Sequence, residues 1–162
     1  MNAMWPLVIF GIILDQMIKL SIVSVLSVGK VIAIVPGFSL YLVMNRGVAL
    51  SLFASLSGSY AFLLNGVIVF FNWMLIELLS VSDDSQPLYR YSLQLIIAGG
   101  LSNLIDRLCY GAVIDYIFLH LAGWQWPAIF NLADVMITFG CVMMMVSAPS
   151  VSRRLSGRLH SA

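Results

Sequence analysis

The hydrophobic positions of the chain form four long runs, and polar, aromatic and turn-forming residues gather between them. A helix that crosses a bilayer needs about 20 mainly apolar residues. The runs that meet this length are about Met4 to Val28, Tyr60 to Leu79, Tyr91 to Tyr110 and Ala128 to Ala148. The pattern therefore predicts an all-α membrane protein with four transmembrane helices, a single domain over residues 1–162 and a cytoplasmic tail over residues 149–162.

The first run differs from a cleavable signal peptide. No basic segment precedes it, it contains Asp15 and Lys19, and no A-x-A-like cleavage site follows it. We therefore expect this run to remain as the first membrane helix.

The segment between the first two runs has the alternation that is typical of a short β-hairpin. Apolar residues alternate on both sides of the Pro36-Gly37 turn, and a second turn follows at Asn45-Arg46-Gly47. Backbone of this kind cannot face lipid unpaired, so the hairpin should lie on the extracytoplasmic surface or against the helices. The segment from Gly111 to Pro127 is rich in aromatic residues, and we expect it to be an interfacial loop before the fourth helix.

Composition supports a membrane protein. Hydrophobic residues make up 61% of the chain and charged residues only 9%, whereas soluble domains carry about 25% charged residues. The net charge of +1 and the lack of a basic face outside the tail argue against a nucleic-acid partner. The two cysteines and two histidines show no metal-ligand spacing, so we expect neither a metal nor a cofactor.

The basic residues of the loops predict the orientation. Arg90 lies between the second and third runs, and Arg153, Arg154 and Arg158 lie in the tail, whereas Lys30 and Arg46 lie on the opposite side. By the positive-inside rule both termini are cytoplasmic, and the segments after the first and third helices face outward.

Acidic residues gather at the outward face of this topology. Asp106 and Arg107 lie at the outer end of the third helix, Asp115 lies in the segment that follows, and Asp134 lies within the first two turns of the fourth helix. Intramembrane charge is costly, about 2.5–3.5 kcal/mol for one side chain at the bilayer centre, so such residues need partners and are often functional.

Spacing within the helices places polar residues on common faces. Asn103 shares a face with Asp106 and Arg107, and Asn131 shares one with Asp134. Asp15 and Lys19 stand four residues apart, and a structural ion pair is favoured over catalysis for them. A structural pair is likewise favoured for Asp106 with Arg107.

Asp115 and Asp134 are the acids that a structural role explains least well. Two carboxyl groups brought together at a low-dielectric boundary share one proton, so that one acts as base and the other as acid. This arrangement activates a water molecule for attack on a peptide carbonyl. The residues alone leave both an aspartic peptidase and an ion-pair scaffold open.

Other function classes fit the pattern less well. A proton or ion conductor needs polar stations across the membrane, but the inner halves of the third and fourth runs are almost wholly apolar. The chain contains neither the G-x-S-x-G motif of serine hydrolases nor the H-E-x-x-H motif of zinc peptidases.

Five ordered motifs resemble the lipoprotein signal peptidase family, also called signal peptidase II. These motifs are Asp15-Gln16-Met17-Ile18-Lys19, Asn45-Arg46-Gly47-Val48-Ala49, Gly99-Gly100-Leu101-Ser102-Asn103-Leu104-Ile105-Asp106-Arg107, Val113-Ile114-Asp115-Tyr116 and Phe130-Asn131-Leu132-Ala133-Asp134. They extend from the first predicted helix to the fourth, so the resemblance covers nearly the whole chain.

The resemblance implies an aspartic endopeptidase of the bacterial inner membrane. Family members remove signal peptides from prolipoproteins, cutting before a diacylglyceryl-modified cysteine at the extracytoplasmic face, and globomycin-type compounds inhibit them. By position, Asp115 and Asp134 match the catalytic pair, and Asp106 matches an acid with a structural role. The residues that match substrate-binding or site-supporting positions are Asp15, Lys19, Asn45, Gly47, Gly100, Asn103, Arg107 and Asn131.

The chain departs from the family pattern beside these residues. Ser102 stands where Gly is common, Ile18 where Ser or Thr is common, and Val48 and Leu50 where Ala and Phe are common. Because the polar set is intact, we expect these changes to affect substrate preference and inhibitor fit rather than the reaction.

Overall fold

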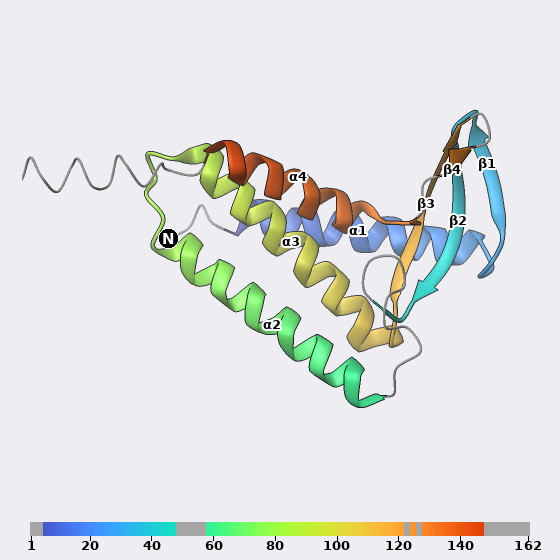
Figure 1. The fold of residues 1–162 in the computed structure, drawn as a ribbon, viewed down its shortest axis with the longest axis horizontal. Helices are drawn as coiled ribbons and strands as arrows, with labels where there is room; N and C mark the ends of the chain where they lie inside the picture. Colours follow the sequence, from blue (N-terminus) through green and yellow to red (C-terminus); the bar gives the residue numbers. More distant parts are fainter. Residues whose placement is uncertain (1–4, 48–57, 122–123, 126–127, 148–162) are drawn as a thin grey trace, which may run out of the picture.

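Four helices and a small antiparallel sheet make up the fold (Figure 1). The computed structural model describes residues 5–47, 58–121, 124–125 and 128–147. The helices are α1 (Pro6–Val25), α2 (Gly58–Ser80), α3 (Pro87–Tyr110) and α4 (Leu132–Ser147), and the strands are β1 (Val31–Val35), β2 (Phe38–Asn45), β3 (Val113–Leu121) and β4 (Trp124–Gln125). The prediction of four helices is therefore confirmed, although α4 begins at Leu132 rather than near residue 128.

Local sequence explains where α1 and α3 begin and where α3 ends. Pro6 and Pro87 occupy the first turn of α1 and α3, where the missing N–H of proline costs nothing. Gly111 ends α3 in the left-handed conformation with a φ of 68°, and its N–H donates to the carbonyl of Arg107. This turn directs the chain from α3 straight into β3.

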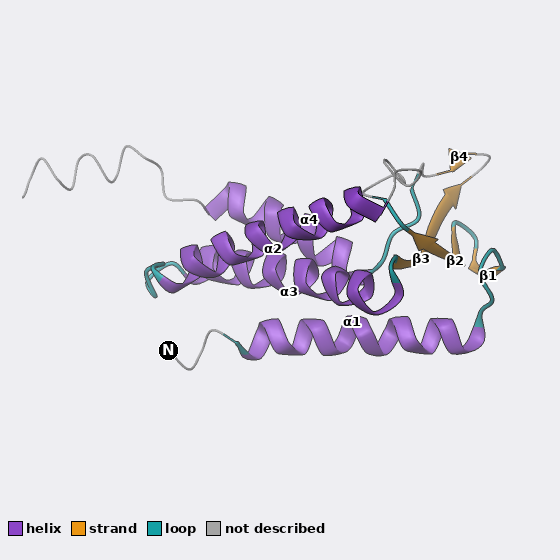
Figure 2. Ribbon diagram, turned by 90° about the horizontal axis from the view of Figure 1, so that it is seen from below, coloured by secondary structure: helices purple, strands orange, loops and turns teal. Residues whose placement is uncertain are grey.

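Helix α3 is the central helix, since it packs against each of the other three (Figure 2). Glycines allow the close approach of α3 and α4. A Cβ on Gly99 would overlap the carbonyl oxygen of Ala133, and one on Gly140 would lie 2.8 Å from the carbonyl oxygen of Ser92. Because α3 is enclosed, it can bury polar side chains such as Gln94 and Asp106.

The outward faces of the helices expose large apolar side chains. Phe62 on α2 is 84% exposed, and Val146 on α4 is 79% exposed. Within the described residues, two helices have the length and hydropathy of membrane spans, Pro6–Val25 and Phe62–Ser80, each with a mean hydropathy of 1.9. Helix α4 is apolar but has 16 residues, and α3 is long but carries several polar side chains. That all four helices cross a membrane therefore stays a prediction.

The strands form a sheet in the order β1-β2-β3-β4. Strands β1 and β2 form the predicted hairpin, in which Gly37 takes a φ of 93° at the turn. The prediction of an interfacial loop over residues 111–127 was wrong for most of that segment, because Val113 to Leu121 form β3 and pair with β2. The β-branched and aromatic residues of this segment favour a strand. The backbone of β3 pairs with the edge of β2, whose N–H and C=O groups would otherwise lack partners.

The sheet lies at one end of the helical bundle (Figure 1). Helix α1 ends and α4 begins at this end, whereas the connection from α2 to α3 lies at the opposite end. The polar residues at the end of α3, on β3 and at the start of α4 are thereby brought to the same region.

Candidate active site

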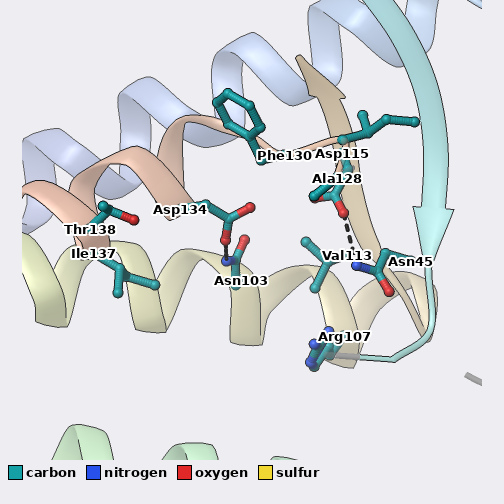
Figure 3. A pocket seen from close by; sticks show the side chains of 11 residues that line it. Asn45, Asn103, Arg107, Val113, Asp115, Ala128, Phe130, Asp134, Ile137 and Thr138 are labelled. Atoms are coloured by element: carbon teal, nitrogen blue, oxygen red, sulfur yellow. Dashed lines mark hydrogen bonds between the residues drawn. The ribbon is translucent and has the colours of Figure 1, made fainter. Parts of the chain in front are cut away.

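A cavity of about 260 Å³ lies where α3, α4, β2 and β3 meet. Figure 3 shows its side chains, which converge from all four elements. The polar lining residues are Asn45, Asn103, Arg107, Asp115, Asp134 and Thr138, and the apolar ones are Val113, Ala128, Ile129, Phe130 and Ile137. The structure thus brings Asp115 and Asp134 to one cavity, as the topology predicted.

Asp115 reaches the cavity from β3 and is only 3% exposed. Its Oδ2 accepts a hydrogen bond of 3.0 Å from Asn45 Nδ2, and its Oδ1 accepts one of 2.8 Å from Asn131 Nδ2. Burial raises the pKa of Asp115 to about 7, because the charged form is poorly solvated there, and the two amide donors oppose this rise. The protonated form of Asp115 is therefore favoured to a higher pH than that of an exposed aspartate.

Asp134 reaches the cavity from the first turn of α4. Its Oδ2 accepts the backbone N–H of Asn131 at 3.2 Å, and its own N–H donates to Asn131 Oδ1 at 2.9 Å. This reciprocal pair is a capping box. Asn131 therefore precedes α4 and caps it, whereas the sequence had placed it on the helix. The N-x-x-D pattern before an apolar run is a sequence signal for such a cap, and it was overlooked.

A chain of amide hydrogen bonds connects the two aspartates. Asn131 Nδ2 donates both to Asp115 Oδ1 and, at 3.1 Å, to Asn103 Oδ1. Lys19 Nζ donates to the same Asn103 oxygen at 2.9 Å. Since the Asn103 oxygen is held by two donors, its Nδ2 faces Asp134 and donates to Oδ1 at 2.8 Å.

A buried ion network lies behind this chain. Lys19 Nζ is 2.7 Å from Asp15 Oδ2 and 2.7 Å from Asp106 Oδ2, and all three side chains are fully buried. The pairing of Asp15 with Lys19 is confirmed. The predicted pairing of Asp106 with Arg107 was wrong: Asp106 instead pairs with Lys19 and accepts a bond from Gln16 Nε2. Its position in the interior, facing α1, explains this choice of partner.

Asp15 also fixes the start of α4. Its Oδ1 accepts the backbone N–H of Ala133 at 3.0 Å, and its Oδ2 accepts the hydroxyl of Ser102 at 2.7 Å. Ser102 in turn accepts a bond from Gln16 Nε2 at 3.0 Å. The departure from Gly at position 102 thus adds a hydroxyl that joins α1 to α3. Sequence reasoning missed this contact, because its partners are far apart along the chain.

Arg107 lies at the edge of the cavity beside β2. Its Nη2 donates to the carbonyl of Gly47 at 2.6 Å, and the Gly47 N–H donates to Asn45 Oδ1 at 3.0 Å. Arg107 Nε and Nη1 are buried and have no partner within the described part of the chain. They are donors available to a molecule in the cavity.

The remaining predicted residues lie elsewhere. Gly100 does not line the cavity, because it faces α2, where a Cβ would lie 2.7 Å from Asn72 Oδ1. Val48 and Leu50 lie outside the described residues.

Thr138 lines the cavity but was not singled out from the sequence; it stands four residues after Asp134, on the same face of α4. No group of His, Cys, Asp or Glu side chains that could hold a metal is found among the residues described.

The arrangement provides a pair of carboxyl groups without a directly paired cation. Neither Asp115 nor Asp134 forms a salt bridge with any described residue, and neutral amides supply their side-chain contacts. Two carboxyl groups in such a setting can share one proton, an arrangement that suits acid and base catalysis with water.

Comparison with known proteins gives the family. The family model described as Signal peptidase (SPase) II matches residues 7–149. The chain belongs to the signal peptidase II family. Membership implies a peptidase, and the match extends from α1 to the end of α4.

Two relatives resemble this signal peptidase II family member over most of the length of both chains. A protein of Paraburkholderia phymatum named lipoprotein signal peptidase is 40% identical over 136 residues, which cover 83% of this chain and 80% of that protein. One of Ralstonia nicotianae with the same name is 37% identical over 138 residues, covering 85% and 79%.

Two solved structures, each described as a bacterial membrane enzyme, have a similar fold. One has a TM-score of 0.73 at 26% identity and covers 86% of this chain and 83% of its own. The other has a TM-score of 0.76 at 24% identity and covers 90% and 91%. The architecture of four helices and a small sheet is thus shared with solved membrane enzymes.

Proposed function

We propose that the protein is a membrane-embedded aspartic endopeptidase that removes signal peptides from diacylglyceryl-modified bacterial prolipoproteins. The cut falls immediately before the lipidated cysteine. The observation that carries this proposal is that Asp115 and Asp134 line one cavity, are joined through two asparagines and have no directly paired cation among the described residues. Membership in the signal peptidase II family supports the substrate class.

In this mechanism Asp134 is the base and Asp115 is the acid. Asp134 removes a proton from a water molecule, whose oxygen attacks the scissile carbonyl. Protonated Asp115 donates a hydrogen bond to the carbonyl oxygen as negative charge develops on it. The proton on Asp134 then passes to the leaving amine. The Arg107 N–H groups that have no partner among the described residues hold the peptide backbone in the cavity.

The proposed location is the inner membrane, with four spanning helices, both termini in the cytoplasm and the active site at the extracytoplasmic face. The exposed apolar side chains of α1, α2 and α4 would contact lipid. The end of the bundle with the sheet would lie at the outer surface, where its strands avoid the hydrocarbon. The substrate's acyl chains would then stay in the bilayer while its peptide reaches the cavity.

Replacement of each aspartate tests the proposal. Asp115→Asn or Asp134→Asn should lower the cleavage rate of a purified diacylglyceryl-modified precursor by at least about 100-fold, because each removes an acid or base. Asp83→Asn, in the exposed connection before α3, is the matched control and should cleave normally. Membrane fractionation would show that all variants still insert. Cleavage by either active-site variant at the control rate would exclude the pair.

Two further measurements separate other function classes. A chelator should leave cleavage unchanged, whereas a globomycin-type compound should inhibit it by occupying the cavity. In liposomes the protein should not conduct protons. Proton flux without any peptidase activity would instead favour the conductor that intramembrane acids can also build.

A further inference from the structure

A second, apolar hollow of about 470 Å³ adjoins the cavity along the outer face of α4. The residues that line this hollow but not the cavity are Leu119, Val135, Phe139 and Val142. On α4, Val135 is 41% exposed, Phe139 57% and Val142 48%. Because they stand at helical spacing, these three side chains form a stripe that leads away from the sheet. We call this hollow the α4 groove.

The cavity and the α4 groove share four residues: Ala128, Phe130, Asp134 and Thr138. The two hollows are therefore continuous, one polar and one apolar, and Thr138 stands at their junction. In Figure 3 the Thr138 hydroxyl oxygen points toward Asp134, which precedes it on α4. A molecule with a polar part and an apolar part could occupy both at once.

Thr138 has the one available donor among the side chains at this junction. Both oxygens of Asp134 already accept hydrogen bonds. Ala128 and Phe130 have apolar side chains, and the backbone groups of Phe130 are bonded to Ile117. The Thr138 hydroxyl has no hydrogen-bond partner within the described ranges, and its position is exposed.

The proposed substrate has polar and apolar parts in the same order as the cavity, Thr138 and the α4 groove. If the proposed function holds, the scissile peptide bond lies in the cavity, and the cysteine sulfur beside it carries glyceryl esters and then acyl chains. An ester carbonyl accepts hydrogen bonds but donates none, so it needs a donor where the polar and apolar regions meet. We propose that the Thr138 hydroxyl donates a hydrogen bond to a glyceryl ester carbonyl while an acyl chain occupies the α4 groove. Thr138 is then a specificity-determining residue.

The test compares two lipidated precursors of the same peptide, one with glyceryl esters and one with the corresponding ethers. The ether precursor keeps both chains but lacks the carbonyl acceptors. The wild-type protein should prefer the ester by about 3- to 10-fold in kcat/KM, the range expected for one hydrogen bond, mostly through KM. Thr138→Val should reduce this ratio to near one, and Thr138→Ser should restore it.

Ser147→Ala provides the matched control. It removes a hydroxyl from the same helix, but that hydroxyl bonds the carbonyl of Met143 and does not line the groove. Its ester-to-ether ratio should equal that of the wild type. An unchanged ratio in Thr138→Val, or a wild type without any preference, would overturn the assignment of Thr138 alone. A wild type that cleaves neither precursor would overturn the proposed function on which the assignment rests.

Discussion

Asp115 and Asp134 face the same cavity from different surroundings, and this difference is the basis of the roles proposed for them. Asp115 is buried on a strand between two amide donors. Asp134 lies in the first turn of α4, where the helix dipole and the Asn131 backbone N–H offset part of the penalty that burial places on its charged form. We therefore propose the strand residue as the acid and the helix residue as the base.

The raised pKa of Asp115 predicts how activity depends on pH. If Asp115 must be protonated, kcat/KM should fall as pH rises above about 7, because the group ionises there. The Asn45 amide stabilises the ionised form, so its removal raises the pKa further. Asn45→Ala should therefore shift this alkaline decline to higher pH.

Ser39→Ala is the control for this measurement. Ser39 lies on the same strand, but its hydroxyl contacts His120 instead of Asp115. Its pH–rate profile should match that of the wild type. A decline that stays in place in Asn45→Ala, or one that moves to lower pH, would contradict the role of Asp115 as the acid.

At the scale of elements, the contact between α3 and α4 sets the distance between the site residues. Asn103 on α3 bonds Asp134 on α4 directly, so the two helices must approach closely. Gly99 and Gly140 allow this approach, since neither position has room for a Cβ. Asp15 adds a third attachment by capping Ala133 from α1.

Gly99→Ala should separate α3 from α4. The new methyl group would overlap the Ala133 carbonyl, and overpacking of this kind costs about 1–3 kcal/mol. Both the free energy of unfolding in detergent and the cleavage rate should fall, because Asp134 moves away from Asn103. Gly66→Ala on α2 is the matched control: no atom lies within 4 Å of its Cβ, and alanine favours the helix by up to about 1 kcal/mol. Equal stability of the two variants would argue against this account.

At the scale of the whole molecule, the candidate site lies toward the end of the bundle that carries the sheet. The cavity, the hairpin and the ion network of Lys19 lie toward this end, whereas the outward faces of the described helices expose large apolar side chains. A one-sided site of this kind fits an enzyme whose substrate arrives from one membrane surface.

Cysteine labelling tests the orientation. In a background with Cys109→Ala and Cys141→Ala, Lys30→Cys lies just before β1 and Ser85→Cys lies in the connection between α2 and α3. Both positions are exposed. A membrane-impermeant maleimide should label the first in intact spheroplasts and the second only after lysis. The reverse pattern would place the active site in the cytoplasm.

The sequence predicted more of the overall architecture than of the contacts. Apolar runs identified the four helices, and alternation about Pro36-Gly37 identified the hairpin, because both patterns are local. Strand β3 was missed because its aromatic residues also suit a membrane interface, and its pairing depends on β2, far away in the sequence.

The same limit applies to the candidate site. The topology brought Asp115 and Asp134 together, but it could not show that Asp106 selects Lys19 as partner, since that choice depends on how α1 packs against α3. Thr138 escaped notice because its position matters only once the α4 groove is known.

The burial of Lys19 has a consequence for biogenesis. Helix α1 is synthesised long before α3, so the Lys19 ammonium first meets only Asp15, its neighbour on the same helix. Its second carboxylate and the Asn103 amide become available when α3 emerges, and the Ala133 N–H that Asp15 caps arrives last. The complete set of contacts that hold α1 therefore requires the C-terminal half of the chain, since the last of these partners belongs to α4.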